Sequence, residues 1–486
     1  MVMASLADKP IRRLTIHEII HELKRDNPAS YVTQEQLASL ERALELPLPG
    51  APDEAWRRVP YNGYSFNDLT LASPAMSAAG DARFITRLTR HDRGASEACS
   101  RFLKRFGTLF EQRRRRNKSR ANDVTENKFF SFNEALSGDA YFVHVPRGTT
   151  VEEPVRIRIN HPSPGRVSLP LVYIHLEPGA ALDLIVEYRD PDETDAGVRD
   201  SGAAGSAYAA DTGTDAGAGP KDPAAAGSVA TEAPSGATPG RANAGLTEVP
   251  ATACVVIKGL LERDARLSML RLQDVPDHAR HFAFERIMVE ENAVLRADSV
   301  TLGGAVAMVE GLYSLMGPES RAEVRDLTGA RGQQFTGMKL TVEHNAPHSY
   351  SDAAIKTVLD DESSGMFTGN IKIPSGSPHS QGYEEHRTLL LGDGAHVQSI
   401  PQLEIIENDV RCSHGSTVTS TVDDDLYYLR SRGLDTEYAT RLLVSAFYQD
   451  VLRRMDLPTR NADARRLIME PLRSRTGLEF DWTEIW

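Results

Sequence analysis

The sequence predicts a mainly β protein whose chain starts and ends in helical regions. Residues 1–127 carry apolar side chains three and four positions apart, which is the spacing of amphipathic helices. In residues 128–418 this spacing gives way to short runs in which apolar and polar residues alternate, as half-buried strands do. Residues 419–486 return to helical spacing with clear start and stop signals. We therefore expect a β core between an N-terminal and a C-terminal helical region.

Three helices are predicted in the N-terminal region. Thr15–Asp26 and Thr33–Leu46 each place isoleucine or leucine on one face, and Asn27-Pro28 separates the two. A third helix is expected from about Ala95 to Arg120. It contains the arginine run Arg113–Arg116, which we interpret as a solvated helix end, with phosphate contact as the alternative.

The central region alternates most clearly at Val155–Ile159 and Asn370–Ile373. Its one tight hairpin signal is Asp393-Gly394, whereas meanders and sandwiches need many such turns. A looser motif recurs instead, in which an acidic residue, asparagine or glycine precedes a small residue and then an apolar one, as at Gly179–Leu182 and Asn292–Leu295. The motif alone leaves a parallel β-helix and a barrel open, and the shortage of hairpins favours the β-helix.

A low-complexity segment interrupts the β region at residues 190–248. Of the fifty residues from 201 to 250, 24 are alanine or glycine and five are proline. Such a composition buries too little apolar surface to offset the entropy lost on ordering the chain. We predict a disordered insert between two strands, Ile185–Tyr188 and Cys254–Ile257.

The C-terminal region contains two well-marked helices. Asp423–Asp425 supplies an N-cap and an acidic first turn for one helix, which Gly433 ends. Asp435 caps the next helix, and a third, kinked near Pro471, is expected after it. One face of the helix that follows Asp435 carries Leu443, Phe447 and Val451.

Composition and missing motifs exclude several classes of protein. The chain has 486 residues and a formal net charge of −13, which argues against general nucleic-acid binding.

No segment approaches the ~18 apolar residues of a membrane span, and the first residues lack the apolar stretch of a secretory signal. The three cysteines lie far apart, so we expect a reducing, cytoplasmic compartment. The sequence has no phosphate loop, dinucleotide fingerprint or nucleophile elbow, so ATP hydrolysis by this chain is not expected.

Two polar clusters carry side chains of the kind that bind metals. His344 and His348 lie four residues apart beside Pro347 without a nearby carboxylate, so we favour a structural or hydrogen-bonding role over a metal site. His379 and Glu384–His386 form a second cluster, which has no recognisable metal spacing and which we interpret as a solvated loop.

A third cluster is Cys412-Ser-His414-Gly415. Side chains two apart on an extended chain point to the same side, so Cys412 and His414 would lie together. A thiolate and an imidazole suit iron or sulfur, and the alternative is a buried cysteine beside a hydrogen-bonded histidine. Cys99 and Cys254 fall in helical and strand patterns and are expected to be inert core residues.

Several motifs between about Thr341 and Leu452 resemble the SufB/SufD family of iron–sulfur cluster assembly scaffolds. They are His344-x-Ala-Pro-x-Ser, Phe367-Thr-Gly369, Pro401–Ile405, Asn408–Thr417, Leu426–Gly433 and Ala446-Phe447. Upstream, Glu54–Arg57 is similar to the family's N-terminal helical element. Cys412–Gly415 matches the D-type pattern, whereas His386 stands where the B-type pattern has a cysteine.

The resemblance implies a right-handed parallel β-helix core and a scaffold that is not itself an enzyme. It also implies a complex with a B-type (SufB-like) paralogue, a SufC-like ABC-type ATPase and a sulfur donor system. A transient iron–sulfur cluster would form at the interface with the B-type partner, and a reduced flavin could serve the complex. His414 is then the first candidate for iron access or cluster ligation, Cys412 the second, and His386 a further one.

The resemblance also assigns ATPase binding to the helices around Leu443, Phe447 and Val451. The same face could instead pack on the end of the β-helix, and both readings stay open. Two other functions are alternatives: a β-helix carbohydrate-active enzyme, which needs paired carboxylates across a groove, and a purely structural subunit without cluster chemistry.

Overall fold

A computed structural model describes residues 19–20, 31–46, 56–57, 59–60, 69–89, 92–93, 96–116, 127–190, 249–420 and 423–476. These residues belong to one compact unit, formed by Met1–Asp190 and Thr247–Trp486. Most of the predicted first helix, Thr15–Asp26, and the predicted insert from residue 191 to residue 248 lie outside the described residues.

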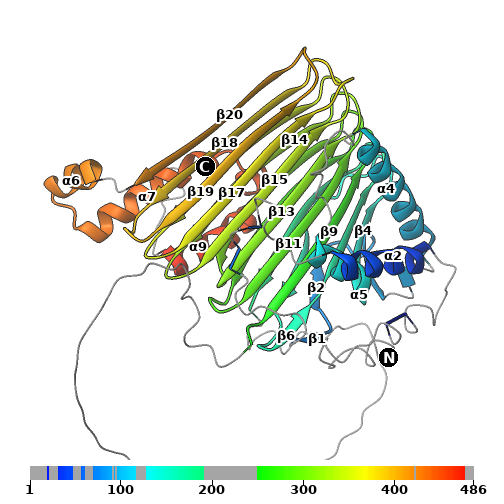
Figure 1. The fold of residues 1–486 in the computed structure, drawn as a ribbon, viewed down its shortest axis with the longest axis horizontal. Coiled ribbons are helices and arrows are strands. Elements are labelled where there is room, and N and C mark those ends of the chain that lie inside the picture. Colours follow the sequence, from blue (N-terminus) through cyan, green and yellow to red (C-terminus); the bar gives the residue numbers. More distant parts are fainter. Residues whose placement is uncertain are drawn as a thin grey trace, which may run out of the picture. The chain divides into compact units, whose positions relative to one another are not determined.

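The β core is a parallel β-solenoid of about eight turns (Figure 1). From β7 to β20, consecutive strands lie in opposite sheets, and each strand pairs in parallel with the strand two further along the chain. Within the described residues the sheets have 11 and nine strands. The strands are β1 (Thr70–Ala72), β2 (Ala75–Ala79), β3 (Ile85–Thr89), β4 (Asp139–Val145), β5 (Val155–Asn160), β6 (Arg166–Ser168), β7 (Leu171–Leu176), β8 (Ala181–Arg189), β9 (Thr252–Leu261), β10 (Arg266–Val275), β11 (Arg280–Val289), β12 (Val294–Gly303), β13 (Val306–Leu315), β14 (Arg321–Ala330), β15 (Phe335–His344), β16 (Tyr350–Leu359), β17 (Ser364–Ile373), β18 (Gln381–Leu390), β19 (His396–Ile405) and β20 (Arg411–Ser420).

This architecture confirms the predicted β-helix core with helices at both ends and excludes the barrel. Alternate residues of each strand point into the space between the sheets, where one continuous apolar cluster forms. In β5, Val155, Ile157 and Ile159 are buried and the intervening arginines are half-buried, as the alternation predicted. In β9 all ten residues are buried, because helices cover the outer face of that sheet. Strands buried on both faces lose their alternation, which is why the pattern fades in the middle of the chain.

The recurring sequence motif marks the turns that begin three of the coils. Gly179, Asp264 and Asn292 have φ angles of 73°, 60° and 55°, the left-handed conformation that reverses the chain. The small residue that follows each of them is fully buried, and the apolar residue after it enters the core. Glu319, His348 and His379 occupy the same left-handed position in later coils, with buried serines in place of alanine.

The coils approach each other closely at Gly317, which precedes one of these turns. A Cβ atom there would overlap the backbone of Glu291 in the preceding coil. We predict that Gly317→Ala lowers the free energy of unfolding by about 1–3 kcal/mol, the usual cost of overpacking a rigid site. Urea denaturation measures this, with Gly415→Ala as the control because its Cβ would meet nothing within 4 Å. Equal stability of the two variants would contradict the prediction.

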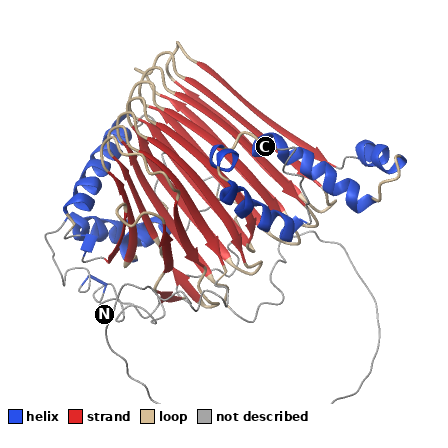
Figure 2. Ribbon diagram, turned by 180° about the vertical axis from the view of Figure 1, so that it is seen from behind, coloured by secondary structure: helices blue, strands red, loops and turns tan. Residues whose placement is uncertain are grey.

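Helices cover part of each sheet's outer face. The N-terminal set lies on the 11-stranded sheet and the C-terminal set on the nine-stranded sheet (Figures 1 and 2). The helices are α2 (Tyr31–Glu45), α4 (Glu97–Arg116), α5 (Lys128–Leu136), α6 (Asp423–Ser431), α7 (Thr436–Leu452), α8 (Asp456–Arg460) and α9 (Ala462–Thr476). Pro471 lies inside α9, and Asp435 caps α7 through a 2.8 Å bond that its Oδ1 accepts from the amide of Tyr438.

The arginine run at the end of α4 is not simply a solvated helix end, which corrects the prediction made from sequence. Arg113 is fully buried, and its Nε and Nη2 donate to the two carboxylate oxygens of Glu343 on β15, both at 2.6 Å. Arg114 and Arg115 are exposed, as predicted. Arg113 therefore ties an N-terminal helix to the solenoid through an ion pair that a local pattern cannot reveal.

Candidate functional site

The last turn of the solenoid ends in two strand edges. β19 and β20 are the final strands of their sheets, and each pairs on one side only within the described chain. Nearly every residue of β20 is exposed, although the strand is ten residues long (Figure 1). Cys412 and His414 both lie on β20, so this open end of the solenoid contains the residues that the sequence singled out.

The register of β20 on β18 brings five candidate side chains together. Cys412 pairs with Gly382, His414 with Glu384, and Ser416 with His386. Gly382, Glu384 and His386 are buried while Tyr383, Glu385 and Arg387 between and after them are not, which places this row on the face that points between the sheets. The matching residues of β20 therefore line the same interior space at its open end.

His414 is exposed, and Cys412 beside it is half-buried. Within the described part of the chain, no hydrogen bond or ion pair involves the His414 ring. Burial raises the pKa of the Cys412 thiol, so the neutral form of this sulfur is favoured in the isolated chain. The imidazole of His414 is thus the more accessible of the two candidate ligands.

His386 lies deeper and joins the two sheets. Its Nδ1 shares a 2.8 Å hydrogen bond with the Ser399 hydroxyl on β19, and its Nε2 shares one of 3.1 Å with Thr357 on β16. The ring also lies 4.5 Å from the ring of Phe367 between centroids. Burial lowers the pKa of His386 to about 4, so the imidazole is neutral at physiological pH. Both ring nitrogens are already engaged by hydroxyls, which gives His386 a clear packing role in this state.

Glu384 is the unusual member of the group. Its side chain is 5% exposed, and its Oε1 atom is buried without a hydrogen-bond partner among the described residues. Burial raises the pKa of this carboxyl group to about 8. The carboxylate occupies the space that a side chain at Gly369, on the opposite sheet, would otherwise fill.

The structure places the residues of the predicted cluster His379 and Glu384–His386 in three different environments. Glu384 and His386 point into the solenoid, Glu385 pairs with Arg387 on the outer surface, and His379 sits at the preceding turn. The prediction of a solvated loop was wrong for residues 384–386, because they belong to strand β18. Sequence reasoning gave Glu384 no role of its own, and the only signal was its i, i+2 spacing from His386.

The other predicted side chains lie outside the row shared by β18 and β20. His344 is buried between the hydroxyls of Ser349 and Ser351, at 2.8 and 2.9 Å, which is a hydrogen-bonding role. Cys99 is buried in α4, and Cys254 is buried in β9 under α5. Burial raises the pKa of both thiols, to about 11 for Cys99, so neither is a reactive thiolate.

The C-terminal helices offer a second candidate surface. Val451 is buried in the apolar cluster between these helices and the nine-stranded sheet, whereas Leu443 and Phe447 are half-buried. Four large side chains of α6 and α7 are exposed instead, and sequence reasoning did not select them. They are Tyr427, Tyr428, Tyr438 and Leu442. α6, which carries Tyr427 and Tyr428, projects away from the solenoid (Figure 1).

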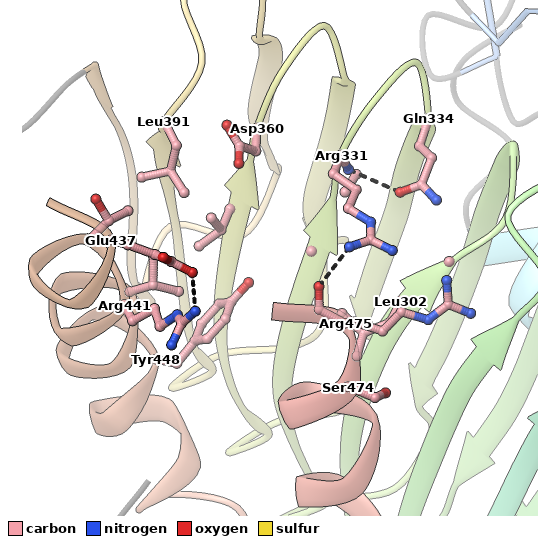
Figure 3. A pocket seen from close by; sticks show the side chains of 16 residues that line it. Leu302, Arg331, Gln334, Asp360, Leu391, Glu437, Arg441, Tyr448, Ser474 and Arg475 are labelled. Carbon is pink, nitrogen blue, oxygen red and sulfur yellow. Dashed lines mark hydrogen bonds and ion pairs between the residues drawn. The ribbon is translucent and has the colours of Figure 1, made fainter. Parts of the chain in front are cut away.

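A cavity of about 470 Å³ lies between α7, α9 and the nine-stranded sheet (Figure 3). Glu437 and Arg441 form an ion pair on one rim. On the other rim, Arg331 donates to the carbonyl of Arg475 at 3.2 Å, and both arginines also pair with Asp277. Because these arginines already have acidic partners, the cavity presents no unpaired cation to a ligand.

Comparison with known proteins identifies the core domain. Residues 240–447 match the family model described as the SUF system FeS cluster assembly, SufBD core domain. The iron–sulfur cluster assembly protein SufD of Escherichia coli is 31% identical over 184 residues, which cover 38% of this chain and 44% of that protein. An iron–sulfur cluster assembly SufBD family protein of Mycobacterium leprae is 30% identical over 210 residues, which cover 42% of this chain and 54% of that protein. A SufBD family protein of Synechocystis is 26% identical over 214 residues, which cover 44% of this chain and 47% of that protein.

The central part of the chain, residues 240–447, is therefore similar to the core domain of iron–sulfur cluster assembly proteins. One of these relatives is named SufD, and the other two are named as SufBD family proteins. The matches span about half the length of these curated relatives. No helix in the described residues is long and apolar enough to cross a membrane.

Proposed function

We propose that this chain is a D-type scaffold subunit whose open solenoid end joins a B-type paralogue, and that a nascent iron–sulfur cluster forms at their junction. The observation that carries the proposal is the pair of unpaired ten-residue edges, β19 and β20, at that end. Long exposed edges aggregate unless something covers them, and a partner with the same kind of sheets can continue both.

The side chains at this edge support the proposal that an iron–sulfur cluster forms there. His414 and Cys412 line the interior face of the edge strand, where a partner's strands would enclose them. Imidazole and thiolate are ligands that iron accepts. The described residues contain no group of three or more ligand-type side chains able to hold a metal alone. Shared ligation across an interface fits a chain that contributes only part of the coordination.

We further propose that the C-terminal helices bind an ABC-type ATPase. The sequence has no phosphate loop, so in this proposal a partner supplies ATP hydrolysis. The proposal also places the complex in the cytoplasm, together with a sulfur donor system. Exposed tyrosines are typical anchors of protein interfaces. Tyr427 and Tyr428 are 76% and 56% exposed on α6, which makes them better anchors than the buried Val451.

Replacing Tyr427 and Tyr428 together with serine should weaken ATPase binding at least about tenfold, because buried aromatic anchors carry most of an interface's affinity. Pull-down and calorimetry with the purified ATPase measure this. Leu44→Ser is the control, since Leu44 is also an exposed apolar residue but lies on α2. Unchanged affinity in the double variant would move the ATPase site elsewhere.

Anaerobic co-purification of the full chain with the B-type paralogue and the ATPase tests the whole proposal. The complex is supplied with ferrous iron, a sulfur donor and reduced flavin, and its mass, iron and sulfide are measured. Iron and sulfide in a stable complex support the scaffold. A stable complex free of both would indicate a purely structural subunit, and sugar binding by the chain alone would indicate a carbohydrate-active protein.

A further inference from the structure

The buried carboxylate of Glu384 has no protein partner that explains it. The side chain is 5% exposed and lies between the two sheets, yet its Oε1 meets no donor among the described residues. An ionised carboxylate buried in this way is unfavourable without a counter-charge, and a protonated one still requires a hydrogen-bond acceptor. Oε1 is therefore left without a partner among the described residues, and a bound cation is a group that would complete it.

The surroundings of Glu384 are shaped to hold its carboxylate. Gly369 on β17 faces it from the opposite sheet, and a Cβ atom at that position would overlap the carboxylate. The room for this acid therefore exists because residue 369 has no side chain. Two residues along each of the same strands, His386 on β18 and Phe367 on β17 lie with their ring centroids 4.5 Å apart and fill the neighbouring space.

On the open side, the neighbour of Glu384 is His414. The two residues are register partners on adjacent parallel strands, so their side chains leave the same face of the sheet. Adjacent strands lie about 4.8 Å apart. A divalent ion about 2.0–2.2 Å from a carboxylate oxygen and from an imidazole nitrogen can bridge side chains at that spacing. Carboxylate with imidazole is also a donor set that ferrous iron accepts.

We propose that Glu384 and His414 together bind a divalent first-row metal ion inside the last turn of the solenoid, with Glu384 as the inner ligand. The inference rests on the proposed function, because it takes the bound ion to be the iron delivered to the nascent cluster. The inference adds Glu384 to the proposed function as the ligand on the interior side of the ion. His414 binds the same ion from the open edge. His386 lies beside the site, two residues from Glu384 on β18, and is not a ligand, because both its nitrogens share hydrogen bonds with hydroxyls.

Anaerobic titration of the full chain with Co²⁺ tests this pair directly, since cobalt reports its ligands through visible absorption. Glu384→Gln should weaken Co²⁺ binding by about 10–100-fold, as the loss of a group that holds or supports a metal does, and His414→Ala should weaken it similarly. Glu385→Gln is the matched control, because it removes the same charge from the same strand on the outer face. The melting temperature of Glu384→Gln should stay equal or rise, since an unpaired buried acid is replaced.

Gly369→Ala provides a second variant that keeps the carboxylate but displaces it, and it should weaken Co²⁺ binding by at least tenfold. If His414→Ala weakens binding while Glu384→Gln and Gly369→Ala bind as the wild type does, the role of Glu384 is overturned and the proposed function stands. If neither His414→Ala nor Glu384→Gln changes the affinity, both the inner ligand and the iron-binding part of the proposed function are overturned.

Discussion

Replacing His414 with alanine should leave the complex with the B-type paralogue intact while its iron site weakens by about 10–100-fold, the usual cost of losing a metal ligand or its support. Assembly should survive because two ten-residue strand edges contribute to the proposed junction and the variant removes one exposed ring. Cys412→Ser should have a smaller effect, since burial raises the pKa of that thiol and favours its neutral form. Iron, sulfide and cluster absorbance of the anaerobically reconstituted complex measure the loss.

His396 supplies the control for this experiment. It is an exposed histidine at the start of β19, in the same final turn of the solenoid, but its ring lies on the other sheet. His396→Ala should retain the cluster content of the wild type. Wild-type iron in the His414→Ala complex would reject the ligand role, and a variant that fails to assemble would instead assign His414 to the interface.

Replacing Arg113 with alanine should lower the free energy of unfolding by about 3–5 kcal/mol, because it leaves the buried Glu343 carboxylate without its cation. Both side chains of the pair are fully buried, and among the described residues Glu343 would keep the 2.9 Å bond from the Ser314 hydroxyl. Urea denaturation of the full chain measures the change. Arg114→Ala is the control, since its ion pair with Glu111 is exposed and should be worth at most about 1 kcal/mol.

A double variant separates the charge from the packing. Arg113→Leu combined with Glu343→Leu removes both buried charges and should recover most of the stability lost in Arg113→Ala, because apolar side chains avoid the desolvation penalty of the pair. If Arg113→Ala loses no more stability than Arg114→Ala, the ion pair does not anchor α4 to the solenoid. That result would leave the aromatic contacts of Phe102 and Phe106 as the attachment.

The turns of the solenoid show which structural features a local sequence motif can predict in this chain and which it cannot. The sequence motif correctly predicts the coil starts at Asp264 and Asn292, because a small buried residue and a core leucine follow each. It fails at His348 and His379, where serine replaces alanine and a histidine adopts the left-handed conformation. The backbone position is the same, but these side chains are not ones that a turn pattern would select.

The sequence by itself determined the helical ends, the β core and the inward face of strands such as β5, because spacing along one strand or helix reports which side is buried. Its family motifs also located Cys412 and His414. Only the tertiary structure decided that Glu384 lies inside the solenoid beside His414, and that Arg113 meets Glu343 across 230 residues of chain. The physical reason is that both contacts join separate elements, whose register and burial arise when the coils stack and not from local residue order.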